Sequence, residues 1–150
     1  ITKENLEIIE LLLRSGARVD NRNSKGYTPL IQAINTGKKD IVQLLLDYKV
    51  DVNLECEDGV APLKFAITKE NLEVIGLLLR RGARTDNRDS NEETPLIHAI
   101  RIGMRDIIQL LLDHGADVIL GGEGGITPLQ IATNIRDVGV IQLLLRNGAR

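Results

Sequence analysis

The stretch that decides the fold is GYTPLIQAINTGKKDIVQLLL, residues 26–46. Its Thr28-Pro29 pair is typical of a helix start, because the hydroxyl caps free N–H groups and proline suits the first helical position. After a loop that contains Gly37, Asp40 begins a second run of apolar residues at helical spacing, which ends in three leucines. A carboxylate in the first turn favours the helix dipole. The stretch therefore predicts two short helices joined by a loop.

The same pattern returns along the whole chain every 33 residues, without an insertion or a gap. A helix pair with one narrow apolar stripe cannot bury that stripe alone, so the copies must stack on one another. Glycines such as Gly82 follow the second helices, as a left-handed C-terminal cap requires. The register is set by leucine triplets at 11–13, 44–46, 77–79, 110–112 and 143–145, and by Pro-Leu pairs at 29–30, 62–63, 95–96 and 128–129.

We therefore predict an all-α solenoid, in which helix-loop-helix-finger units of 33 residues stack into a curved rod that forms one domain over residues 1–150. The sequence has only two tyrosines, one phenylalanine and no tryptophan. The core is thus expected to consist of thin aliphatic layers. The units run over about 1–22 (partial), 23–55, 56–88, 89–121 and 122–150 (partial).

A longer period of 66 residues is superimposed on the first, because residues 1–7 recur letter for letter at 67–73. We interpret the chain as a duplicated pair of unlike units. Alternate turns also differ in charge: Arg22 and Arg88 lie in basic turns, whereas the turn that follows each of them is acidic. Two interpretations stay open, in which neighbouring turns attract one another or the bands of charge match those of a partner.

These motifs resemble the ankyrin repeat over essentially the whole chain. The residues that carry the resemblance are Gly26-Tyr27-Thr28-Pro29-Leu30, Ala33, the run from Ile41 to Leu46 and the run from Leu110 to Val118. Ankyrin-repeat proteins are mostly non-catalytic scaffolds that bind other proteins, so the resemblance implies this function for a partner that it does not identify. It also implies that the partner contacts the tips of the long turns, the fingers, and the exposed side of each first helix.

Carried over onto matching positions, the resemblance implies a set of partner-binding candidates. Tyr27, Arg88 and Arg101 are favoured, because tyrosine and arginine are enriched among residues that dominate binding energy. Exposed isoleucines at such positions lack an obvious role in solubility, although burial between units is the alternative for them. The full set is Arg22, Lys25, Tyr27, Asn35, Thr36, Glu57, Asp58, Val60, Lys69, Arg88, Asn91, Glu93, Arg101, Ile102, Glu123, Ile126 and Ile135.

The composition speaks against several other classes of function. A net charge of −2 supplies no basic field that would attract phosphate backbones, and the few aromatic residues offer no stacking platforms for single strands. No apolar run approaches the roughly 18 residues that indicate a membrane span. We therefore expect a protein partner, with no nucleic acid and no membrane insertion.

No residue pattern points to catalysis, to a metal or to a cofactor. His98 and His114 have no partner arrangement that suggests a triad, and the glycines of 121–125 are not followed by the Lys-Ser/Thr of a phosphate loop. Cys56 is the single cysteine and lacks zinc-ligand spacing. We expect neither enzyme activity nor a cofactor, and a reducing, intracellular and cytoplasmic location.

One position departs from the family pattern in every unit. A histidine commonly follows the Pro-Leu pair and ties the first helix to the finger. Its absence predicts that this tie is missing throughout. The residues found there are Ile31, Lys64, Ile97 and Gln130.

Two fingers depart from the pattern at other positions. Lys49 replaces a capping glycine and Ala61 a capping threonine, so we expect residues 49–61 to form the least stable internal finger. Glu92 replaces a turn glycine, and we expect Asn91 to take the positive φ in its place.

Alternatives to a free-standing scaffold also follow. The sequence begins inside a first helix at Ile1 and stops inside a finger at Arg150, so more repeats are expected beyond it. The chain would then be a spacer or regulatory segment of a larger enzyme, channel or secreted effector. Ordinary leucine triplets in the end units allow end-to-end self-association. Asn53 resembles the finger asparagine that some ankyrin repeats offer to an asparaginyl hydroxylase, and a turn-stabilising role is the alternative.

Overall fold

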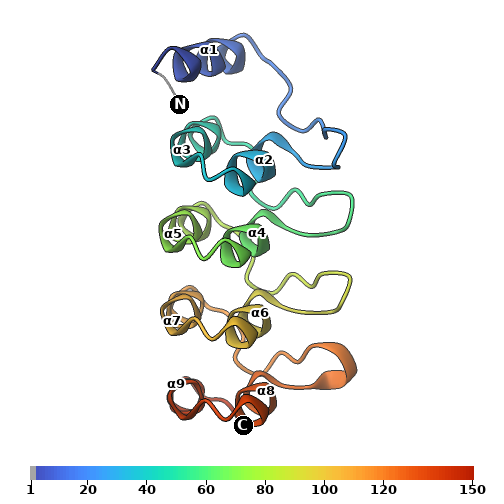
Figure 1. Ribbon diagram of the computed structural model, residues 1–150, viewed down its shortest axis with the longest axis vertical. Coiled ribbons are helices and arrows are strands. Elements are labelled where there is room, and N and C mark those ends of the chain that lie inside the picture. Colours follow the sequence, from blue (N-terminus) through green and yellow to red (C-terminus); the bar gives the residue numbers. More distant parts are fainter. Residues whose placement is uncertain (1–2) are drawn as a thin grey trace.

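The computed structural model describes residues 3–150, in which helices alternate with long turns and no strand occurs (Figure 1). Ile1 and Thr2, which we expected inside a first helix, lie outside the described residues. The elements are α1 (Lys3–Arg14), α2 (Pro29–Asn35), α3 (Lys39–Asp47), α4 (Pro62–Thr68), α5 (Leu72–Arg80), α6 (Pro95–Ile102), α7 (Arg105–Asp113), the 3-10 turn η1 (Glu123–Gly125), α8 (Pro128–Ile135) and α9 (Val138–Arg146).

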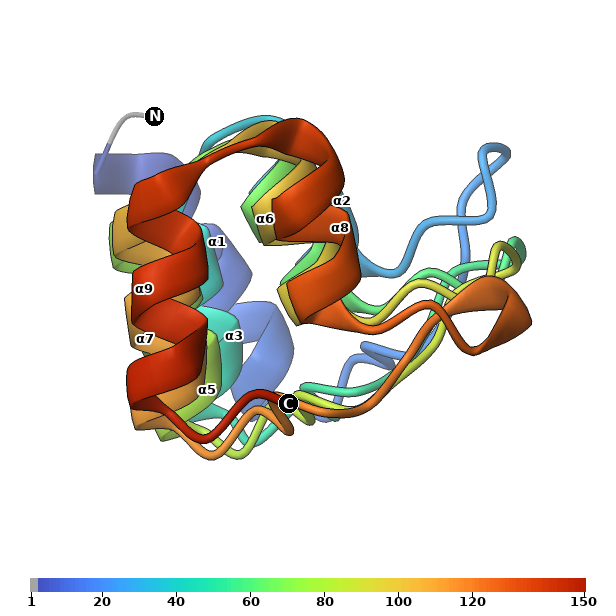
Figure 2. The ribbon, with the colours of Figure 1, turned by 90° about the horizontal axis from the view of Figure 1, so that it is seen from below.

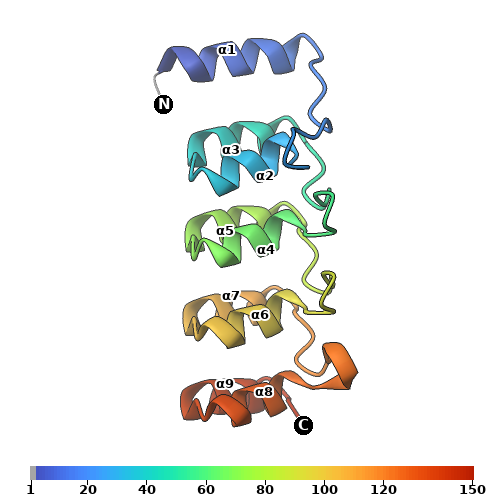
Figure 3. The ribbon, with the colours of Figure 1, turned by 45° about the vertical axis from the view of Figure 1, so that its right-hand side comes forward.

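The helices form two layers along a single file of units (Figures 1 and 3). The first helices α2, α4, α6 and α8 make one layer, and the second helices α1, α3, α5, α7 and α9 make the other (Figure 2). Helices α2 to α9 pack in pairs within their units, and every helix packs on its counterpart in a neighbouring unit. This arrangement confirms the predicted solenoid. The fingers project away from both layers and span residues 16–27, 49–61, 82–93 and 115–126.

The core is a series of aliphatic layers that neighbouring units share. The middle leucines of the triplets form one column of it, in which Leu78 and Leu111 are wholly buried. A column of alanines lies in the first helices, and Ala66 and Ala99 are wholly buried there, where a larger residue would hold neighbouring helices apart. Each buried leucine contributes about 1.5–3 kcal/mol. The units therefore stabilise one another.

The helix ends follow the predicted chemistry. The hydroxyls of Thr28 and Thr94 each accept a hydrogen bond from a backbone N–H group three residues on, at 3.3 and 3.2 Å. Thr127 makes the same bond with Gln130, whose side-chain oxygen accepts in return from the Thr127 N–H. This reciprocal pair is a capping box. The glycines that follow the second helices have φ between +82° and +89°; they are Gly16, Gly82, Gly115 and Gly148.

Helix α1 departs from the expected helix-loop-helix pattern. Residues 69–71 make the corner between α4 and α5, where Glu70 has a φ of 54°. The identical residues 3–5 belong to one continuous helix. Because the same letters adopt both conformations, the corner is imposed by the packing of α4 on α5. That packing holds Glu70 in the left-handed region, at a cost of about 1–2 kcal/mol.

Alternate fingers are held differently at their tips. Asn23 Oδ1 accepts hydrogen bonds of 2.9 and 3.0 Å from two backbone N–H groups of the first finger. Asp89 Oδ1 accepts two such bonds in the third finger, both at 2.9 Å. Cys56 and Gly122 occupy the equivalent positions and have no side-chain oxygen to offer. We call the first and third fingers the tied fingers, and the second and fourth the untied fingers.

The second finger has the two weak points that the sequence predicts. Lys49 has a φ of 56°, and Ala61 begins α4 without a side-chain cap. Asn53 holds the base of this finger, because its side chain accepts from the Arg84 N–H at 2.8 Å and donates to the Gly82 carbonyl at 3.2 Å. These bonds favour the turn-stabilising interpretation of Asn53. The junctions with α3 and α4 are therefore where the finger is weak.

The turn of the third finger differs from its prediction. Positive φ was expected at Asn91, but Glu92 itself has a φ of 57°. The reason is that the Glu92 N–H donates to the Asp89 carbonyl at 2.9 Å, and this closes the same turn that Gly26 closes in the first finger. The hydrogen-bonded turn thus fixes the backbone, and Glu92 adopts the strained left-handed conformation.

Replacing Leu78 by alanine is expected to lower the free energy of unfolding by about 2–5 kcal/mol, because it removes a wholly buried side chain from a shared layer. Leu12 holds the same place in α1 but is 52% exposed. Leu12→Ala is therefore the matched control and should cost about 1 kcal/mol or less. Urea unfolding followed by circular dichroism measures both. Equal losses would contradict a core made of shared layers.

Amide hydrogen exchange is expected to be faster in residues 49–61 than in residues 16–27 and 82–93, because a finger with weak junctions opens at a lower free energy. Mass spectrometry of peptic fragments measures it. Lys49→Gly should slow the exchange of this finger, since relief of the left-handed lysine raises the opening free energy by about 1 kcal/mol. Slower exchange at 49–61 than in the tied fingers is the contrary result.

Candidate partner-binding groove

A hollow of ≈ 320 Å³ opens between the third and fourth fingers, where they meet the first helices. Ile97 of α6 and Ile131 of α8 give it apolar lining. Gly122 keeps one wall thin, since a Cβ there would come within 3.0 Å of Ile97 Cδ1. The structure brings several of the predicted candidates together around this hollow; they are Asn91, Glu93, Arg101, Glu123 and Ile126.

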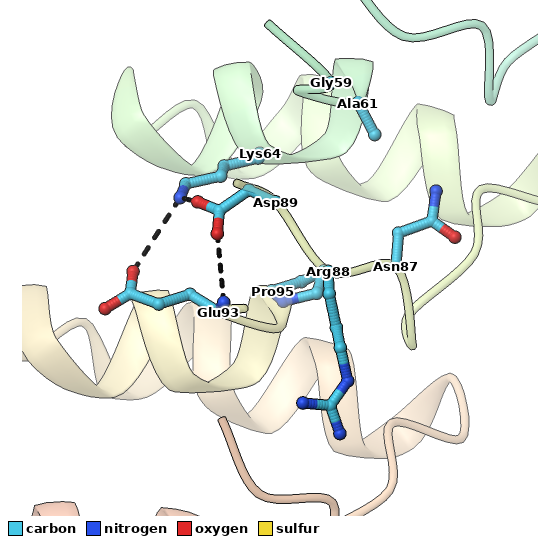
Figure 4. A pocket seen from close by; sticks show the side chains of 8 residues that line it. All are labelled: Gly59, Ala61, Lys64, Asn87, Arg88, Asp89, Glu93 and Pro95. Carbon is cyan, nitrogen blue, oxygen red and sulfur yellow. Dashed lines mark hydrogen bonds and ion pairs between the residues drawn. The ribbon is translucent and has the colours of Figure 1, made fainter. Parts of the chain in front are cut away.

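The carboxylate of Glu93 organises one wall of the hollow. Arg101 Nε lies 2.6 Å from Glu93 Oε1, and the ammonium of Lys64 lies 3.7 Å from Oε2. Lys64 also pairs with Asp89, whose side chain is only 4% exposed. Figure 4 shows the Lys64 ammonium meeting the carboxylates of Asp89 and Glu93. A buried ion pair is tolerated when further hydrogen bonds satisfy its atoms, and Asp89 has them from its own finger.

The predicted absence of a helix-to-finger tie is wrong at Lys64. Lysine is not the histidine of the family pattern, yet its ammonium joins α4 to Asp89 and Glu93 of the following finger. Its long, flexible stem makes this reach possible. The equivalent residues serve elsewhere: Ile31 and Ile97 are buried, and Gln130 completes the capping box.

His98 lies beside this cluster, half-buried on α6. Its Nε2 is 3.1 Å from Thr68 Oγ1, and its Nδ1 is 3.6 Å from Glu93 Oε2. Burial lowers the pKa of His98, the Lys64 ammonium lowers it further, and the Glu93 carboxylate opposes both. Burial also lowers the pKa of Lys64, against the attraction of Glu93. The imidazole is therefore neutral at pH 7.

The candidates of the first finger are partly committed to contacts within the chain. Arg22 donates to the carbonyl of Glu55 at 2.8 Å, which links the first finger to the second. The ring of Tyr27 packs edge-to-face on Phe65 of the next unit, with the ring centroids 5.2 Å apart. Thr36 Oγ1 donates to a carbonyl of its own helix. Lys25 is exposed and Asn35 is half-buried.

Five further candidates do not line the hollow. Glu57, Asp58, Lys69 and Arg88 are exposed, and Val60 is half-buried. In Figure 4 the Arg88 side chain points away from the Lys64–Asp89 pair. These residues stay predictions from the resemblance alone.

The three candidate isoleucines are exposed. The exposed fractions of Ile102, Ile126 and Ile135 are 36%, 44% and 49%, so the alternative that buries them between units is wrong. Of the three, Ile126 lines the hollow. Ile102 and Ile135 lie at the C-terminal ends of α6 and α8.

The arginines of the first and third fingers form ion pairs within their own fingers. Arg18 pairs with Asp20 at 3.1 Å, and Arg84 pairs with Asp86 at 3.2 Å, each within one finger. In residues 3–150 no ion pair joins the side chains of two neighbouring fingers. No ion pair therefore supports the interpretation in which neighbouring turns attract one another. The interpretation in which the charges match those of a partner stays a prediction.

Sequence reasoning missed five residues that shape the site. Lys64 had a signal, because a charged residue at the histidine position calls for a partner in the next unit. Asp89 had one too, as a carboxylate at the base of a turn. No local pattern marks the other three as lining; they are Ile97, Ile131 and Gly122.

The described part of the chain holds no group of three or more His, Cys, Asp or Glu side chains that could bind a metal ion. Within residues 3–150, none of the helices combines the length and the apolar character that crossing a membrane requires. The thiol of Cys56 is buried.

Acidification from about pH 7.5 to 5.5 is expected to destabilise the protein more than its His98→Gln variant. The pKa of His98 is depressed by burial in the folded state, so the unfolded chain binds its proton first and stability falls as the pH drops through about 6.5. Glutamine can keep a hydrogen bond to Thr68. Urea unfolding at a series of pH values measures the difference, and parallel pH profiles would contradict it.

Comparison with known proteins agrees with this architecture. A family model for ankyrin repeats in three copies matches residues 1–89 and 78–150. No curated protein matches the sequence. Among solved structures 523 chains match, so the fold alone does not single out a partner.

One of these structures is the ankyrin repeat domain of Bcl-3, described as a unique member of the IkappaB protein family. It is 30% identical to this chain and superposes with a TM-score of 0.91 over 97% of it. The chain spans 66% of the length of that Bcl-3 chain. Ankyrin repeats generally mediate interactions between proteins. With the family pattern matched from its first residue to its last, the chain belongs to the ankyrin-repeat family.

Proposed function

We propose that this chain is a non-catalytic scaffold that holds a partner protein between its fingers and its first helices, with the hollow beside Ile126 at the centre of the contact. The main support is the composition of that hollow. Three isoleucines, Ile97, Ile126 and Ile131, give it an apolar part, and polar groups that converge around them make up the rest of the lining, a combination found in binding sites.

The lining indicates what the partner would present. An aliphatic or aromatic side chain fits against Ile97, Ile126 and Ile131. Arg101 binds Glu93 through Nε, and its outward N–H groups suit a carbonyl or carboxylate of the partner. Arginine beside an apolar pocket is a common anchor of binding energy. Complementary bands of charge on the partner would then meet the basic first finger and the acidic second finger.

The partner is identified by placing a photo-crosslinking residue at Asn91, on the rim of the hollow, and for comparison at Gln142 on α9. Lysate from the native source is irradiated, and the adducts are sequenced by mass spectrometry. The proposal expects a specific adduct from Asn91 and not from Gln142. A chain that captures no specific protein from either position would favour the spacer function.

Ile126→Glu is expected to weaken the purified complex by about tenfold or more, which is about 1.4 kcal/mol, because it replaces an apolar contact of the hollow by a charge. Ile119 is an aliphatic residue of the same finger with nearly the same exposure, 43% against 44%. It does not line the hollow, so Ile119→Glu is the matched control and should leave the affinity within about twofold. Isothermal titration calorimetry measures both. Equal losses would place the contact elsewhere.

A further inference from the structure

Polar side chains close most of the outer face of the second-helix layer. We define a seam as the line between neighbouring second helices. Within residues 3–150, side-chain hydrogen bonds or ion pairs cross every seam except the one between α5 and α7. The contacts at the other seams join Arg14 to Tyr48, Lys39 to Glu73, Arg81 to Asp47 and Arg105 to Asp137.

A hollow of ≈ 400 Å³ lies on the α5–α7 seam. It opens over Gly76, in the middle of α5, whereas the equivalent positions of α3, α7 and α9 all carry glutamine. Leu72 borders it and is 44% exposed, and Leu110 borders it from α7. The seam therefore presents an apolar hollow to solvent on the side of the molecule away from the fingers (Figure 2).

Packing within the chain does not require glycine at position 76. Glycine weakens a helix interior more than any residue except proline. A Cβ there would meet only Arg80 Nη1, at 3.1 Å, and this is the far end of a flexible side chain. The backbone is ordinary helix, with no positive φ. Gly76 is buried beneath the Arg80 side chain, so a group from outside the chain can reach it once that flexible side chain swings aside.

The charges around the hollow are mainly negative. The carboxylates of Glu73, Asp106 and Asp113 line it, against the single guanidinium of Arg80. Glu73 is paired with Lys39 on the far side of α5, and Asp113 accepts a hydrogen bond from the Gln109 side chain at 2.6 Å. Cations of a partner would find complementary charge at Asp106 and Asp113.

We propose that the α5–α7 seam is a second protein-docking surface, and that its occupant is a basic amphipathic helix of a partner protein. An aliphatic side chain of that helix enters over Gly76, between Leu72 and Leu110. Lysine or arginine residues on either side of it face Asp106 and Asp113. An amphipathic helix laid in an apolar groove is a recurring mode of recognition. This surface lies away from the finger groove, and either can exist without the other.

The probe is a synthetic alanine-based helical peptide of about 14 residues, long enough to lie along α5, with a leucine stripe flanked by lysines. In ¹⁵N–¹H spectra of the full chain, we expect saturable shifts at Leu72, Gly76 and Leu110. A matched peptide with glutamate at every lysine position should bind at least about tenfold more weakly, if at all. Equal binding of the two peptides, or shifts spread over other acidic surfaces, overturns the proposal.

Gly76→Gln is the decisive variant, since it fills the hollow with the residue that the other units carry. We expect it to fold, to melt at a higher temperature and to bind the lysine peptide at least about tenfold more weakly. Asp113→Asn gives a second readout that keeps the hollow open, and it should weaken binding about threefold. Unchanged binding by Gly76→Gln overturns the proposal. Ile126→Glu should leave this binding unaltered, which separates the seam from the finger groove.

Discussion

The aliphatic layer between neighbouring units is the constraint on which the rest of the structure depends. Helix α2 has 7 residues and α3 has 9, whereas an isolated helix needs roughly 12–15 to be even marginally stable in water. Neither can persist without a neighbour that covers its apolar stripe. Stability is therefore approximately a sum of contacts between adjacent units. The same contacts position the fingers, because every finger starts and ends at a helix that such a layer holds in place.

The fold could be predicted in nearly all respects, because its determinants recur in register. Thr28, Thr94 and Thr127 cap helices as their position before proline predicts. The errors have two causes, a hydrogen-bonded turn at Glu92 and helix packing at residues 69–71. Glu92 takes the conformation that local rules assign to Asn91, and one run of letters is a corner at 69–71 but a continuous helix at 3–5. A short stretch of sequence does not show which neighbouring helix will pack against it.

The candidate site was predicted less completely, for a physical reason. Residues on the rim of the hollow, such as Asn91 and Ile126, could be predicted because the fingers repeat. The wall could not be, because it depends on Lys64 reaching across a unit boundary to Asp89 and Glu93. The exposure of the three isoleucines could not be predicted either, because it depends on how closely neighbouring units pack around them. The 33-residue repeat does not specify how far a side chain reaches or how closely neighbouring units pack.

The alternation of tied and untied fingers has a consequence for the hollow, which is bordered by one of each kind. Asp89 anchors the third finger by accepting two hydrogen bonds from the finger's own backbone and by forming an ion pair with Lys64. The fourth has Gly122 at the equivalent position and further glycines at 121, 124 and 125. The third finger is therefore the more rigid border of the hollow, and the glycine-rich fourth finger is the more flexible one. A ligand in this hollow would be positioned by the third finger, whereas the fourth finger can adjust to ligands of different width.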